Sequence, residues 1–125
     1  MATASEPKVE YSAKHRYARI SATKVRPMAD MIRGKFADEA LEILRYQPQR
    51  GARMLEKVIK SALGSAQDPD NPKNKGRNAN VDGLIVKTVS VDGGPMFKRV
   101  RPRARGMAFM IRKRFAHINV TLEEV

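Results

Sequence analysis

Residues 84–122 read LIVKTVSVDGGPMFKRVRPRARGMAFMIRKRFAHINVTL. Residues 84–91 are rich in β-branched side chains, and in residues 116–122 apolar and polar side chains alternate. Both patterns are typical of β-strands. A hairpin connection normally takes about two to five residues, whereas roughly twenty separate these two strands. The excess length predicts a connection with a structure and a role of its own.

The connecting segment is strongly basic and carries no acidic residue between Gly93 and Arg114. From Arg99 to Arg105 an arginine occupies every second position, which in extended chain places the guanidinium groups on one face. Without a nearby carboxylate these groups need external anions, and phosphate fits because the guanidinium fork can bond two oxygens at once. We therefore predict an extended basic hairpin over residues 92–115. Its cations are Lys98, Arg99, Arg101, Arg103, Arg105, Arg112, Lys113 and Arg114.

The alternative for this segment is a flexible, solvated basic loop. Such a loop would explain the charge, but solvated tails are depleted in apolar residues. Here apolar residues are interleaved with the cations, namely Phe97, Val100, Met107, Phe109 and Met110. We therefore favour a hairpin that is ordered by its partner.

The N-terminal part of the chain predicts a strand followed by a helix. Residues 9–20 mix aromatic and aliphatic side chains in an imperfect alternation that indicates a strand. Ser21 is a suitable N-cap for the helix, and Gly34 is well placed to end it. Since Pro27 is unfavourable in a helix interior, the helix could instead begin nearer Lys24.

Two further helices and a loop precede the residues 84–122. A short helix capped by Asp38 is expected to end before Pro48. Residues 52–66 have the clearest helical spacing of apolar side chains, and residues 68–82, rich in Asn, Asp, Pro and Lys, predict an exposed polar loop. Helices on one face of an antiparallel sheet would give an α+β fold.

The composition limits the classes of function. A chain of 125 residues has room for one domain, 1–125, with residues 1–8 as a flexible tail. Its 25 Lys and Arg against 13 Asp and Glu give a formal charge of +12, which favours nucleic acid as the partner. There is no cysteine, no apolar run of spanning length and no secretory signal. We expect a cytoplasmic protein that binds no membrane, no metal and no cofactor and that forms no homo-oligomer.

A second basic cluster lies far from the hairpin in the sequence. It could extend the same electrostatic face, or it could be a scatter of solvated surface charge. If both clusters together neutralise about eight phosphates, the logarithm of RNA affinity should fall against the logarithm of salt with a slope of roughly −6 to −7. The members of this cluster are Lys14, His15, Arg16, Arg19, Lys24 and Arg26.

Catalytic residues are scarce. A two-histidine ribonuclease would need His15 and His117, the only histidines, to converge on one phosphate, and nothing in the sequence brings them together. No nucleotide-binding glycine loop or metal-ligand spacing is present. A DNA-compacting or regulatory protein remains the rival from another class, since basic charge alone would serve it equally well.

The string GPMFKRVRPRARGMA, followed by IRKRFAHINVTLEE, resembles the hairpin and final strand of the L twenty-two family of universal large-subunit ribosomal proteins. The resemblance extends upstream through YARISATKVRPMADMIRGK, EALEILRYQP and EKVIKSAL. It implies three helices packed on a small antiparallel three-stranded sheet, with a long protruding β-hairpin. It also implies a non-enzymatic structural constituent of the large ribosomal subunit that assists its assembly.

The partners implied by the resemblance are large-subunit ribosomal RNA, neighbouring ribosomal proteins and the nascent peptide in the exit tunnel. Met107 stands where the family commonly has a basic residue, Gly93 where it has an acidic one, and the 68–82 loop is longer and more basic than usual. The residues expected to bind ribosomal RNA are Lys14, His15, Arg16, Arg19, Lys24, Arg26, Phe97, Lys98, Arg99, Arg101, Arg103, Arg105, Arg112, Lys113, Arg114 and His117. The residues expected to line the tunnel are Lys98, Arg99, Arg101, Pro102, Arg103, Ala104, Arg105 and Gly106.

Overall fold

The computed structural model describes residues 9–74 and 81–124, and within this part of the chain it confirms the predicted α+β fold. The predicted flexible tail and residues 75–80 of the predicted polar loop lie outside the described residues. Short 3-10 turns occur at Pro72–Asn74, Val81–Gly83 and Ala104–Gly106. The main elements are β1 (Glu10–Ala18), α1 (Ala22–Ile32), α2 (Ala37–Arg45), α3 (Arg50–Gln67), β2 (Leu84–Pro102) and β3 (Ala108–Glu124).

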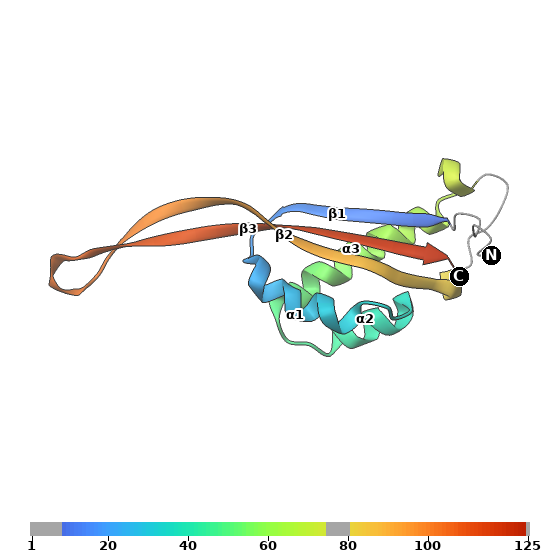
Figure 1. Cartoon of the computed structure of the whole chain (residues 1–125), viewed down its shortest axis with the longest axis horizontal. Helices are drawn as coiled ribbons and strands as arrows, with labels where there is room; N and C mark the ends of the chain where they lie inside the picture. The colour runs from blue at the N-terminus through green and yellow to red at the C-terminus, as the bar shows by residue number, and fades with distance from the viewer. Residues whose placement is uncertain (1–8, 75–80, 125) are drawn as a thin grey trace, which may run out of the picture.

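The three strands form one antiparallel sheet in the order β1-β3-β2, so β3 is central. Leu122 of β3 pairs with Tyr11 of β1 and with Val86 of β2, and all three side chains are buried. Paired residues share a face, so this face of the sheet is the core face. It is covered by the helices, with α3 packed on β1 and β3 and α1 packed on β2 (Figure 1).

The N-cap of α1 is the predicted residue, whereas that of α2 is not. Ser21 is the N-cap of α1 as predicted, but the suggested later start near Lys24 is wrong, because α1 begins at Ala22 and contains Pro27. The burial of the apolar face of α1 outweighs the single backbone hydrogen bond that a proline removes. The N-cap of α2 is Phe36 instead of Asp38. Asp38 lies in the first turn, where its negative charge interacts favourably with the helix dipole.

β2 and β3 continue far beyond the sheet as a twisted two-stranded ribbon that projects away from the helices (Figure 1). We call residues 96–114 the arm. The pairing shifts by one residue between Gly93 and Met96, a β-bulge that separates the arm from the sheet. At the tip, Arg103 N donates to Met107 O at 2.7 Å, and Arg105 and Gly106 both have positive φ. The long predicted hairpin is therefore confirmed as a continuous strand pair.

Candidate nucleic-acid interface

The arm carries its cations on both faces. Arg99 pairs with Ile111 and Arg101 with Phe109, so these two arginines share a face, as the alternation in the sequence predicted. Lys98 pairs with Arg112 on the opposite face, where two like charges lie directly across from each other. Such a pair is unfavourable in isolation and becomes favourable when an anion lies between the two cations.

Aromatic rings hold some of the arm cations in place. The Arg99 Cζ atom lies 5.2 Å from the centroid of the Phe97 ring, and the Arg103 Cζ atom lies 5.8 Å from that of Phe109. Both distances are typical of cation–π contacts. Among the described residues, no carboxylate forms a salt bridge with an arm cation. The positive charge of the arm is therefore not neutralised within the described protein.

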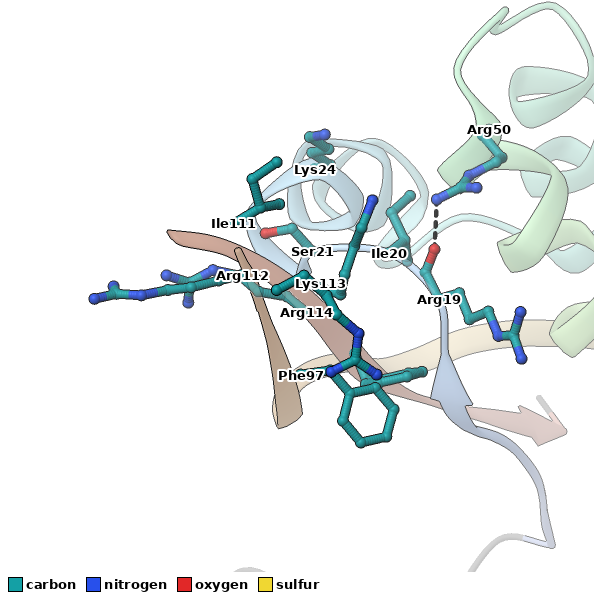
Figure 2. A pocket seen from close by; sticks show the side chains of 12 residues that line it. Arg19, Ile20, Ser21, Lys24, Arg50, Phe97, Ile111, Arg112, Lys113 and Arg114 are labelled. Atoms are coloured by element: carbon teal, nitrogen blue, oxygen red, sulfur yellow. Dashed lines mark hydrogen bonds between the residues drawn. The ribbon is translucent and has the colours of Figure 1, made fainter. Parts of the chain in front are cut away.

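A groove with a volume of about 850 Å³ lies where the arm leaves the sheet (Figure 2), and we call it the basic groove. Seven of its twelve lining residues are cationic and none is acidic, so the groove concentrates positive potential. Its lining residues are Arg19, Ile20, Ser21, Lys24, Arg50, Phe97, Arg99, Ile111, Arg112, Lys113, Arg114 and Phe115.

Four separate segments of the sequence build the basic groove, namely residues 19–24, Arg50, Phe97 with Arg99, and residues 111–115. One side is the β1–α1 connection around Ile20, and the opposite side is the base of the arm. In Figure 2, Lys113 extends from β3 toward α1, whereas Arg114 points to the side where Phe97 lies. The groove thus brings Arg19 and Lys24 of the second basic cluster next to cations of the hairpin. The sequence analysis had suggested one continuous basic face for the whole cluster, but only these two members lie in the groove.

Arg50 is the groove cation that the sequence analysis missed. It is the first residue of α3, and its guanidinium Nη2 donates to the carbonyl oxygen of Arg19, which ties α3 to the β1–α1 connection (Figure 2). A cation in the first turn of a helix opposes the helix dipole. This unfavourable position of Arg50 was the feature of the sequence that could have indicated a contact of its side chain outside α3.

The remaining members of the second cluster do not line the groove. Lys14 and His15 lie on opposite faces of β1, and the Arg16 Cζ atom lies 5.9 Å from the centroid of the Tyr17 ring. Arg26 donates from Nε and Nη2 to the carbonyl oxygen of Val91, at 3.3 and 3.2 Å. Two of its donors are thus engaged in joining α1 to β2, which leaves Arg26 fewer donors for an external anion.

His117 holds a backbone irregularity in place. Its Nδ1 atom accepts a hydrogen bond from Tyr17 N at 3.0 Å, and its ring contacts the Tyr17 ring edge-on at 4.9 Å. Tyr17 has a φ of 57°, in the left-handed region, beside the β-bulge of β1. His15 pairs with Ile118, the neighbour of His117, so the two histidines project from opposite faces of the sheet. A shared acid–base site between them is therefore excluded.

Within residues 9–74 and 81–124, no three His, Cys, Asp or Glu side chains are grouped as metal ligands. In the same part of the chain, no helix has both the length and the apolar character needed to cross a membrane. The arm and the basic groove present fixed positive charge and exposed aromatic rings.

Comparison with known proteins gives a family match and several similar proteins. Residues 13–123 match the family model described as ribosomal protein L22p/L17e. The chain is 64% identical over 116 residues to the large ribosomal subunit protein uL22 of Rhodopirellula baltica, covering 93% of this chain and 96% of the relative. It is 50% identical over 113 residues to the protein of the same name from Caldicellulosiruptor saccharolyticus, covering 90% of this chain and 87% of the relative.

Proposed function

Since the chain belongs to the ribosomal protein L22p/L17e family, we propose that its arm and basic groove bind large-subunit ribosomal RNA and assist its folding during assembly. The chain is a structural constituent of the large ribosomal subunit and not an enzyme.

The observation that carries this proposal is the unneutralised charge of the arm. Between Gly93 and Arg114 there are eight Lys and Arg side chains and no Asp or Glu. A ribbon of two strands has no core of its own, so these side chains do not stabilise the free fold. Phosphate oxygens are the anions that such a surface would meet in ribosomal RNA, and arginine binds them with two donors at once.

We further propose that the tip of the arm lines the tunnel through which the nascent peptide leaves. The arm extends roughly 30 Å from the bulge, at about 3.3 Å per residue. No helix covers it (Figure 1), so it can enter a narrow space between RNA segments. The tunnel-lining candidates run from Lys98, near the base of the arm, to Gly106 at its tip, and the exposed apolar side chain of Val100 lies among them.

The pairing of the strands provides a clean test of RNA binding by the arm. Phe97 and Lys113 are directly paired, so a two-residue Asn-Gly turn can replace residues 98–112 without altering the sheet. The shortened chain should keep its circular dichroism spectrum and unfolding midpoint, because no buried core residue is removed. Cosedimentation with large subunits should survive a high-salt wash for the full chain and be lost for the shortened one. Equal retention of the two chains would contradict the proposal.

The tunnel assignment has a separate test. A photoreactive amino acid at Ala104, in the tip, should cross-link to a nascent peptide on translating ribosomes. The same photoreactive amino acid at Tyr46, which is 83% exposed at the end of α2, serves as the control and should not cross-link. A cross-link from Tyr46 but not from Ala104 would place the arm elsewhere.

A further inference from the structure

We propose that the basic groove binds an unpaired RNA strand and that one base of this strand stacks on Phe97. This inference rests on the proposed function, because it names the kind of RNA that one part of the surface takes. The groove lies where the base of the arm meets the β1–α1 connection and the start of α3. Residues 100–110, the distal part of the arm, do not line it.

The shape of the groove favours an unpaired strand. Its volume of about 850 Å³ falls within the roughly 300–1,000 Å³ of pockets that enclose a small molecule of a few rings. A duplex is convex and keeps its bases paired in its interior, so it could only lay phosphates across the rim. An unpaired strand can turn a base into the hollow while its phosphates stay among the cations.

The lining of the groove has the two components that such a strand needs. Its cations come from both sides, with Lys24 and Arg50 on the helical side and Arg114 on the arm side, so a backbone passing between them is contacted twice. The other lining residues are mainly apolar, and they include Phe97 and Phe115. Cationic walls combined with exposed aromatic rings are the usual surface for single-stranded nucleic acid.

Phe97 is held in position and still half exposed. Its ring meets the Phe115 ring at 88° with the centroids 5.3 Å apart, and Arg99 lies over it at 5.2 Å. Nevertheless 52% of the residue remains accessible. A base stacked on Phe97 would cover this apolar surface, and the guanidinium of Arg99 would add a cation–π contact.

An acidic protein segment is the other macromolecule that the cations would attract. Carboxylates would satisfy the charge, but the Asp and Glu side chains that carry them have no flat ring to cover Phe97, whereas every nucleotide has one. The exposed Phe97 ring therefore favours RNA. Binding of an acidic segment is tested below with polyglutamate.

The absence of tryptophan from the chain allows a direct test. In the full-length Phe97→Trp variant, the introduced indole is the only tryptophan side chain, and a stacked base should quench its emission. The probe is an unpaired RNA of about four nucleotides, comparable to the smallest sites of single-strand binders. We expect quenching of about twofold or more at saturation, which an RNA duplex, inorganic polyphosphate or polyglutamate does not produce. Unchanged emission while anisotropy reports bound RNA would overturn the inference, as would equal quenching by polyphosphate or polyglutamate.

A matched control is available in the arm. Phe109 is 49% exposed and also lies beneath an arginine, Arg103, but it is outside the groove. The indole introduced by Phe109→Trp should be quenched far less by the short RNA. Equal quenching at both positions would show binding along the whole ribbon and would overturn a site at the groove.

Affinity supplies the second measurement. Phe97→Leu keeps an apolar side chain against Phe115 but removes the ring, so affinity for the short unpaired RNA should fall about tenfold, as expected for one stacked base. Affinity for a duplex should not change. An equal loss for both RNAs would overturn the inference. Failure of the unaltered chain to bind any RNA would instead refute the proposed function, so the two failures are distinguishable.

Discussion

Replacing Arg101 and Arg103 with glutamine should lower the salt dependence of RNA binding by an amount set by local phosphate contacts. Arg101 lies in β2 and Arg103 follows it at the tip, and both side chains are exposed. Each contact with a phosphate contributes about 0.7 to 0.9 to the slope of log affinity against log salt, so the slope should become shallower by about 1.4 to 1.8. Between about 50 and 200 mM salt, the variant should therefore lose roughly tenfold less affinity than the unaltered chain.

The assay is a titration of labelled large-subunit RNA fragments at several salt concentrations. Its control is the double variant Lys57→Gln and Lys60→Gln, which removes the same formal charge from exposed positions on α3, outside the groove. That control should leave the slope nearly unchanged. If both double variants changed the slope equally, the net charge of the molecule would explain binding, and the assignment to the arm would be refuted.

Three further predictions concern stability. Asn74→Ala should lower the free energy of unfolding in urea by about 2–3 kcal/mol, because the buried Asn74 amide donates to Ala66 O and Asp68 O at the end of α3 and accepts from the Tyr11 hydroxyl. Gly94→Ala should cost roughly 1 kcal/mol, since an added Cβ would lie 3.1 Å from His117 Nε2, whereas Gly93→Ala, with open space around it, should cost little. The hydrogen bond and ion pair with Glu10 raise the pKa of Lys87 above its ordinary 10.5. The stability advantage over Lys87→Met should therefore be complete below that pH and disappear as the pH rises through the higher folded pKa.

Much of the fold could be predicted because each element buries a regular apolar pattern. The spacing in residues 52–66 and the alternation around Ile118 and Val120 follow directly from the periods of a helix and a strand. The exact ends of β2 and β3 could not be predicted from burial, because the arm residues are almost all exposed on both faces. Its excess length and charge were the signals that remained.

The basic groove and the buried Asn74 depended on contacts between distant parts of the chain. Arg50 enters the groove because α3 begins beside Arg19, which no local pattern encodes. Asn74 falls in a polar stretch predicted to be an exposed loop, but it is buried because its amide caps α3 and meets Tyr11. The hairpin cations were predicted to bind RNA from their local density alone, and that prediction stays a prediction. The engagement of Arg26 with Val91 O could not be predicted, because the two residues are far apart in the sequence.

The central claim is that the arm is a cationic extension whose order in the ribosome is supplied by surrounding RNA. Hydrogen exchange of the backbone amides, measured with and without large-subunit RNA, tests it most directly. In the free chain the amides of residues 98–112 should exchange much faster than those of residues 116–122, and RNA should protect the former strongly. Protection of the arm equal to that of the sheet without RNA, or no change when RNA binds, would contradict the claim.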